Sequence, residues 1–413
     1  MTTSLATRVD RERLWQRHML LARHGATPAG GVSRAALSGE EVAARRELIG
    51  WGEAIGLTPF TDPAGNLFLR YAGRNADAAP VLSGSHLDSQ PTGGKFDGVY
   101  GVLAALEAVE AMRDAGHVPA RPIEVVAWMN EEGSRFAPGM MGSAAFCGAV
   151  PVAEVLRVRD AGGITVGEAL AATNRAFPAL ALQPLGRPVA AYVEAHIEQG
   201  PVLEREALQV GIVTGMQGKR TFRVTVTGEE AHAGTTPHRD RKDALLAATA
   251  MIQALATALH DDADVMRFTV GRFEVTPNAP SVIAGRAQFS IDLRHPDDAT
   301  LRAAGDRVAT VCEENAGRCS LSVVELSTAV PLVFPEAMQE TIAAAARRLA
   351  IPTMRLPSSA GHDARYLHAV CPTGMIFVPC KDGISHNEAE SALPEDLHAG
   401  ACVLVETLAV LAG

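Results

Sequence analysis

Apolar and polar positions alternate in blocks along the first half of the chain. Short apolar runs cover residues 81–86, 122–129 and 189–196, the second of them rich in β-branched side chains, and each has the length of a buried strand. Residues 96–115 instead repeat apolar side chains at helical spacing, and Gly116 follows them, which predicts a helix that ends there. Strands that alternate with helices predict an open α/β sheet.

The N-terminal segment has an amphipathic pattern as well. It predicts a helix with one apolar face, formed by Leu14, Met19, Leu20 and Leu21. Three histidines have polar sequence neighbours and are expected to be solvated: His18, His24 and His117.

The pattern changes near Gly215. Residues 220–228 alternate with period two, as in a strand with one solvated face. Two helices and three further strand-like runs follow, over 243–260, 266–275, 287–293, 299–316 and 321–326. These elements predict a compact α+β sandwich inserted into the larger domain. A helix at 335–350 and a strand at 374–379 then resume the first pattern, so we expect residues 1–213 and 330–413 to form one domain and 214–329 the insertion.

The composition fits a soluble globular protein of two or three domains: 413 residues, 47% hydrophobic and 20% charged. The net charge of −10 and the lack of a basic stripe argue against a nucleic-acid partner. The N-terminus lacks the apolar core of a signal peptide, and no apolar stretch is long enough to cross a membrane, so a cytoplasmic location is expected by default. None of the six cysteines forms a Cys-x-x-Cys pair, and we expect free thiols.

Metal-ligand residue types follow four of the apolar runs. They lie in the segments 84–98, 130–133, 194–200 and 385–388, which are rich in His, Asp and Glu. Sites in open α/β sheets form where the carboxyl ends of strands meet. Imidazoles and carboxylates in these numbers are what a two-metal hydrolytic site requires.

Taken together, the motifs resemble one enzyme family. The resemblance is to N-carbamoyl-L-amino-acid hydrolases, β-ureidopropionases and allantoate amidohydrolases, in the dinuclear-metal aminoacylase and carboxypeptidase superfamily. It runs nearly end to end and is carried by Gly84–Ser89, Gly93–Gly98, Asn130–Phe136, His196–Pro201, Ala231–Pro237, Pro277-Asn278, Asp292–Arg294 and Ser385–Glu388. It implies an α/β fold: an open mixed-sheet metallohydrolase domain flanked by helices, with an inserted α+β sandwich that serves as lid and dimerisation domain.

The resemblance also implies the ligand set. Asp97 would bridge two divalent ions, with His86 and His196 on one and Glu132 and His386 on the other. The ions would be zinc, or manganese, cobalt or nickel, which imidazole also suits. Two further acids receive roles: Glu131 as general base, or else as a carboxylate behind the ligands, and Asp88 as acceptor from the free nitrogen of His86, or else as a turn residue.

Substrate contacts are implied by the same resemblance. Arg294 would clamp a carboxylate, unless it forms a surface ion pair with Asp292 or Asp297. Asn278 would add a hydrogen bond, His232 would stabilise a developing oxyanion and reach the partner's site in a homodimer, and Gln199 is a further contact. The roles of His362 and Asp363 stay open: they either support the site or belong to loop structure. Glu198 is expected to have a structural role.

The implied reaction is hydrolysis of the carbamoyl C–N bond of an N-carbamoyl amino acid, giving the amino acid, ammonia and CO2. One alternative is an allantoate amidohydrolase. Another is an aminoacylase or dipeptidase, against which His196 counts, because those branches usually supply a carboxylate there. A non-catalytic amino-acid-binding protein is the remote alternative, and the presence of Glu131 beside a full ligand set argues against it.

Overall fold

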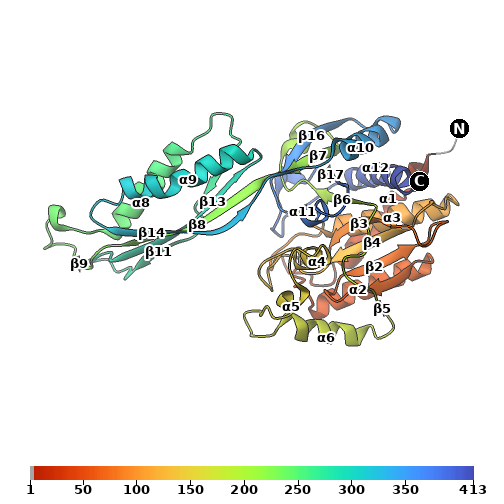
Figure 1. Cartoon of the computed structure of the whole chain (residues 1–413), viewed down its shortest axis with the longest axis horizontal. Helices are drawn as coiled ribbons and strands as arrows, with labels where there is room; N and C mark the ends of the chain where they lie inside the picture. The colour runs from red at the N-terminus through yellow and green to blue at the C-terminus, as the bar shows by residue number, and fades with distance from the viewer. Residues whose placement is uncertain (1–3) are drawn as a thin grey trace. The chain divides into compact units, whose positions relative to one another are not determined.

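The computed structural model describes residues 4–413, and the chain divides into two compact units. The first unit runs to Thr214 and resumes over Phe334–Gly413, and the second is Gly215–Val333, drawn in green to cyan in Figure 1. The catalytic and lid roles expected of these two parts remain predictions.

A ten-stranded mixed sheet forms the centre of the first unit. Four adjacent parallel strands lie in its middle, in the order β4 (Ile123–Trp128), β3 (Val81–His86), β6 (Ala191–Ile197) and β17 (Thr373–Val378). Its other strands are β1 (Thr58–Thr61), β2 (Leu67–Tyr71), β5 (Ala181–Leu182), β7 (Val210–Met216), β15 (Leu332–Val333) and β16 (Thr353–Ser358). The open mixed sheet flanked by helices confirms the predicted fold class (Figure 1).

Long helices build the largest core on one face of this sheet. α3 (Val99–Asp114) packs against β3 and β6, and α12 (Pro394–Ala412) packs against α3. The remaining helices of the unit are η1 (Leu5–Arg8), α1 (Arg11–Leu21), α2 (Gly39–Ala54), α4 (Met141–Phe146), α5 (Val152–Val155), α6 (Val166–Ala176), α7 (Val202–Arg205), α10 (Glu336–Arg348), α11 (Ala364–Leu367) and η3 (Lys381–Gly383). Fourteen of the sixteen residues of α3 are buried, so this helix is a rigid base for the segment that precedes it.

Two expectations for α1 were wrong. Leu20 is 37% exposed, because the buried face of the helix is formed by Leu14, His18 and Leu21 instead. His18 is fully buried against the rings of Phe96 and Tyr100, and its Nδ1 donates to the Leu14 carbonyl at 2.8 Å.

The second unit is an antiparallel sheet with two helices. Its strand order is β10-β13-β8-β14, with β11 beside β13. The strands are β8 (Gly218–Thr227), β10 (Arg267–Thr269), β11 (Phe273–Thr276), β13 (Arg286–His295) and β14 (Ser320–Ala329), with β9 (Ala231–His232) and β12 (Val282–Ile283) as a separate pair. Its helices are η2 (His238–Asp240), α8 (Ala244–Ala258) and α9 (Asp298–Glu314). Alternate residues of β8, such as Val224 and Val226, enter the core beneath α8 and α9, as the period-two pattern predicted.

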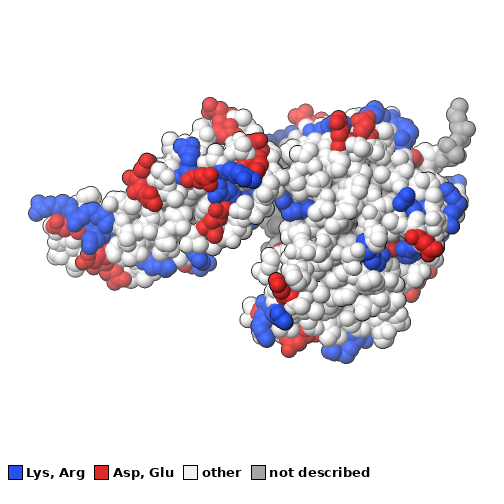
Figure 2. Space-filling view, in the orientation of Figure 1, with Lys and Arg blue, Asp and Glu red and all other residues white. Residues whose placement is uncertain are grey.

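The distribution of charged side chains and the state of the cysteines agree with what the composition indicated. Lysine and arginine side chains are interspersed with acidic ones over the face shown in Figure 2. Within residues 4–413 no helix is long and apolar enough to cross a membrane, and all six cysteines are free thiols, as expected.

Candidate metal centre

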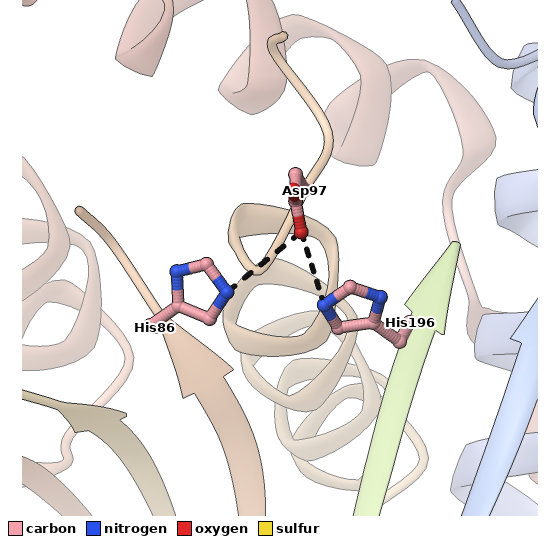
Figure 3. A group of neighbouring side chains, drawn as sticks. All are labelled: His86, Asp97 and His196. Carbon is pink, nitrogen blue, oxygen red and sulfur yellow. Dashed lines mark ion pairs between the residues drawn. The ribbon is translucent and has the colours of Figure 1, made fainter. Parts of the chain in front are cut away.

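Two histidines and an aspartate converge at the carboxyl end of the central strands. His86 ends β3, His196 is the penultimate residue of β6, and Asp97 lies just before α3. Figure 3 shows both imidazoles directed at the Asp97 carboxylate: Asp97 Oδ1 is 3.8 Å from His86 Nε2 and 3.2 Å from His196 Nε2. All three side chains are buried.

A second group shares the same carboxylate. His386 Nε2 is 3.3 Å from Asp97 Oδ2 and 3.5 Å from Glu132 Oε2. Asp97 therefore presents one oxygen to the two strand-end histidines and the other to His386. The two groups are His86, Asp97 and His196, and Asp97, Glu132 and His386; in each, the potential ligand atoms lie within 4.8 Å of one another.

Backbone carbonyls set the orientation of both strand-end imidazoles. His86 Nδ1 donates to the Asp88 carbonyl and His196 Nδ1 to the Ile197 carbonyl, each at 2.9 Å, which directs both Nε2 atoms at Asp97. Asp88 was expected to accept a hydrogen bond from the free nitrogen of His86, and it does so through its main-chain carbonyl rather than its side chain. Its carboxylate lies 3.8 Å from that nitrogen and accepts the backbone N–H groups of Glu131 and Glu132, at 3.2 and 3.1 Å. Its short side chain reaches the turn after β4, so Asp88 orients the two neighbouring glutamates.

Glu131 and Glu132 diverge from that turn. Glu131 Oε2 lies 3.5 Å from His86 Nε2, whereas Glu132 faces His386. Burial raises the pKa of Glu131 well above its usual range, and the charges of Asp363 and Glu132 raise it further. The turn is tight, since Asn130 has a φ of +54° and donates its side-chain amide to the Phe136 carbonyl at 2.8 Å.

The charge balance of the centre fits a cationic occupant. Burial, followed by the charge of Asp97, raises the pKa of Glu132 to about 7. Burial would also raise the pKa of Asp97, but hydrogen bonds from His196 and His386 hold it well below its usual range. Buried carboxylates thus crowd around three imidazoles, and oxygen and imidazole nitrogen donors are those that divalent transition metals take. The residues present therefore fit metal binding.

Further side chains surround the shared carboxylate. The Gln199 amide donates to Asp97 Oδ2 at 3.0 Å and to Ser385 Oγ at 3.1 Å, so Gln199 lies on the ligand cluster. The buried His362 ring packs against His196 with a centroid distance of 4.4 Å and an interplanar angle of 63°. The buried Asp363 accepts a hydrogen bond from Ser143 Oγ. His362 and Asp363 therefore border the ligand cluster as well as forming its loop.

Glu198 lies outside the ligand groups. Its carboxylate accepts the backbone N–H groups of Val202 and Leu203, both at 2.8 Å, at the start of α7. This contact supports a local structural role.

Sequence reasoning missed three residues that hold the ligands. Gln90 Nε2 donates to Glu132 Oε2 at 2.7 Å, and its backbone N–H donates to Oε1 at 3.2 Å. Glu194, two residues before His196, accepts Ser85 Oγ at 2.7 Å. Glu390 accepts the backbone N–H groups of both Phe96 and Asp97. The available signals were their positions: each lies within four residues of a motif histidine or aspartate on the same loop or strand.

The remaining candidates belong to the second unit. His232 is on β9 opposite Val282, and its exposed ring accepts the backbone N–H of Gly234 at 3.0 Å. Asn278 is exposed and has a φ of +56°. Arg294, on β13, pairs with Asp292 at 2.9 Å, which is one of the alternatives the sequence left open. The substrate-binding roles of these residues remain predictions.

Comparison with known proteins identifies the family. The sequence matches "Peptidase family M20/M25/M40" over residues 82–410. It is 40% identical over 402 residues to an N-carbamoyl-L-amino-acid amidohydrolase of Rhizobium meliloti, covering 96% of this chain and 95% of the relative. An allantoate amidohydrolase of Bacillus subtilis is 34% identical over 401 residues, covering 95% of each. The crystal structure of a hydantoinase/carbamoylase family amidase from Burkholderia multivorans superposes with a TM-score of 0.92 at 45% identity, covering 98% of both chains. The chain belongs to peptidase family M20/M25/M40 and, within it, to the hydantoinase/carbamoylase amidases.

Proposed function

We propose that this protein hydrolyses the carbamoyl C–N bond of N-carbamoyl-L-amino acids, releasing the amino acid, ammonia and CO2. One observation supports this most strongly. Asp97 lies between two histidine-containing ligand groups, in a chain 40% identical over nearly its whole length to a relative named for this reaction. Relatives named for allantoate are less similar, at 34%, so allantoate is the second candidate.

Five side chains would hold two divalent cations: His86 and His196 on one, Glu132 and His386 on the other, and Asp97 on both. A shared carboxylate suits this role because it offsets the repulsion between two dications. When bound, the cations supply a polarised carbonyl and a water acidic enough to act as hydroxide at neutral pH. Zinc, manganese, cobalt and nickel all accept such a donor set.

Glu131 is the proposed general base. Its carboxylate lies on the His86 side of the cluster, within one water molecule's reach of the ligand atoms. It takes one proton from the attacking water, whose oxygen bonds to the carbamoyl carbon, and delivers that proton to the leaving nitrogen as the C–N bond breaks. The carbamic acid that remains then loses CO2 and releases the second nitrogen as an amine, which completes the three products. Asp88 keeps Glu131 in place, through the backbone N–H that its carboxylate accepts.

Recognition of the substrate is assigned to four residues: Gln199, His232, Asn278 and Arg294. A guanidinium binds a carboxylate through two parallel hydrogen bonds, so Arg294 would hold the amino-acid carboxylate. In this structure its Nε and Nη2 donate to the two carboxylate oxygens of Asp292, at 2.9 and 3.3 Å. His232 would stabilise the developing oxyanion.

A homodimer is part of the proposal. In the described part of the second unit, β14 is the last strand of its sheet and is exposed along most of its length, including Val324 and Leu326. A long apolar edge strand is a ready surface for pairing with another chain. Two-fold symmetry would bring the same strand of a second copy against it.

The test is ammonia release from a substrate panel. The protein is stripped of metal, reloaded with zinc, manganese or cobalt, and offered N-carbamoyl-L- and D-amino acids, N-carbamoyl-β-alanine, allantoate and N-acetyl-L-amino acids, the last assayed by amine release. We expect N-carbamoyl-L-amino acids to give the highest kcat/KM, and Glu131→Gln to lower kcat by about 10²–10⁴-fold for every substrate that the wild-type protein turns over. Higher kcat/KM on allantoate or on N-acetyl amino acids would refute the proposal.

A further inference from the structure

A carboxylate outside the ligand set joins the two loops of the metal centre. Glu390 is four residues beyond His386, is 4% exposed, and directs its carboxylate at the main chain around Asp97. We infer that Glu390 is a positioning residue that holds this main chain where Asp97 can reach both cations. The inference depends on the proposed metal centre and not on the identity of the substrate.

The contacts of Glu390 span both loops. Its Oε1 accepts the backbone N–H of Phe96 at 2.9 Å and of Asp97 at 3.1 Å. Its Oε2 lies 3.0 Å from Ser385 Oγ, which is itself 3.2 Å from Asp97 Oδ2. One side chain thus fixes the backbone of the shared ligand and, through Ser385, the loop that carries His386.

Gly94 provides independent support for this arrangement. A Cβ added at Gly94 would lie 2.0 Å from the carboxyl carbon of Glu390, so any side chain there would displace that carboxylate. The backbone of Gly94 is not left-handed, since its φ is not among the positive values, and space is therefore the reason for glycine. Because Gly94 of the 93–98 motif has no side chain, the Glu390 carboxylate can lie in the space beside it.

The start of the Glu390 side chain is fixed as well. Its backbone N–H donates to the Asn387 carbonyl at 3.0 Å, and the Lys381 N–H donates to the Ser391 carbonyl at 2.8 Å, which closes the base of the loop. Removing the carboxylate would leave two buried N–H groups, those of Phe96 and Asp97, without an acceptor. Asp97 would then be free to turn away from one of its two ligand groups.

Three variants separate this role from a merely structural one. Glu390→Gln keeps an oxygen that can accept both N–H groups and an amide that can donate to Ser385 Oγ. Glu390→Ala removes the acceptor. Gly94→Ala displaces the carboxylate without changing it. Glu395→Ala, an exposed acid of the following helix, is the matched control.

Two readouts do not require activity. The first is the affinity of the metal-free protein for zinc, measured against a chromophoric chelator. We expect Glu390→Ala and Gly94→Ala to weaken it by about 10–100-fold, as removal of residues behind metal ligands does, and Glu390→Gln and Glu395→Ala to change it by no more than a few fold. The second is amide hydrogen exchange of Phe96 and Asp97 in the metal-free protein, which should accelerate in the same two variants.

The double variant Gly94→Ala/Glu390→Gly makes the test sharper. The Cβ of Glu390 would itself lie 2.4 Å from a Cβ added at Gly94, so Glu390→Gly, which is also measured alone, removes this contact together with the carboxylate. The added Cβ then has room, and the two losses in zinc affinity should not add. Additive losses would overturn the inference, as would wild-type affinity and exchange in Glu390→Ala, or a loss in Glu390→Gln as large as in Glu390→Ala. If Glu390→Ala does not fold, Gly94→Ala decides, because unchanged zinc affinity there would refute the contact's role. Failure of the wild-type chain to bind zinc would refute the metal centre itself, and this result can be distinguished from a failure of the inference about Glu390.

Discussion

Gly98 is the position where one added methyl group is expected to remove a ligand from the metal centre. It precedes α3 with a φ of +66°, and a Cβ built there would lie 2.3 Å from ring atoms of His86. Because Cβ contacts become ordinary only at 3.4 Å, the ring would have to retreat by the difference, about 1 Å. Metal–ligand distances tolerate only about 0.2 Å, so Gly98→Ala should take His86 out of coordination.

Gly116 offers a matched control at the other end of α3. Its φ is also +66°, but a Cβ there would meet nothing within 4 Å. Both alanine variants carry the cost of a left-handed non-glycine residue, about 1–2 kcal/mol of unfolding free energy. Only Gly98→Ala adds the collision with the ligand, and we expect a loss in metal affinity of at least the ~10–100-fold seen when the support of a ligand is removed.

Zinc titration of the metal-free variants against a chelator measures the difference, and denaturant unfolding of the same samples measures the shared backbone cost. Gly116→Ala should lose stability but keep wild-type affinity. If Gly98→Ala bound zinc as tightly as Gly116→Ala does, His86 would not be a ligand, or its position would not be set by this close approach.

Four further outcomes are expected. Glu131→Gln should retain metal and KM while kcat falls by about 10²–10⁴-fold, and near-normal turnover would exclude it as base. Asp97→Ala should lose both metals by elemental analysis, and retention of both would contradict the shared-ligand assignment. Arg294→Ala should lower kcat/KM for N-carbamoyl acids by an amount that corresponds to about 2–5 kcal/mol of lost transition-state stabilisation, and far less for their neutral amides. Equal losses on both substrates would indicate a structural role. Mixed dimers of His232→Ala and Glu131→Gln subunits should recover up to about half of wild-type activity, because one site of two stays intact under two-fold symmetry, and no recovery would place His232 outside the partner's site.

The sheet of the first unit could be predicted because its central strands are buried on both faces. The apolar run at 81–86 coincides with β3, the run at 122–129 contains β4, and the run at 189–196 covers β6 except for its last residue, Ile197. Continuous apolar runs of this kind are typical of parallel strands covered on both sides. The run at 266–275 was less informative. It forms two strands, β10 and β11, which pair with different parts of β13. Between them, the backbone N–H of Arg272 donates a hydrogen bond to Ser290 Oγ at 3.0 Å.

His18 shows why local polarity misleads. It follows the polar residues Gln16 and Arg17, and a solvated ring was predicted although apolar residues come directly after it. In the fold, α1 packs against α3 and α12, which places His18 beside Phe96 and Tyr100. Burial lowers its pKa to about 4, although the Leu14 carbonyl partly opposes this shift. The contacts that decide its state come from Phe96, just before Asp97, and from Tyr100 at the start of α3, far away in the sequence.

The same separation limits what motifs reveal about the metal centre. Candidate ligands could be found because the motifs that contain them follow strands, and the carboxyl ends of parallel strands meet at one edge of the sheet. The groups that hold the ligands have no such rule: Glu390 is 294 positions from Phe96, whose N–H it accepts. Yet the motif glycines carry part of this information. Gly94 leaves room for Glu390 and Gly98 for the His86 ring. At Gly94, where no positive φ explains the glycine, the reason is a group that lies against the backbone, and the structure identifies that group as the Glu390 side chain.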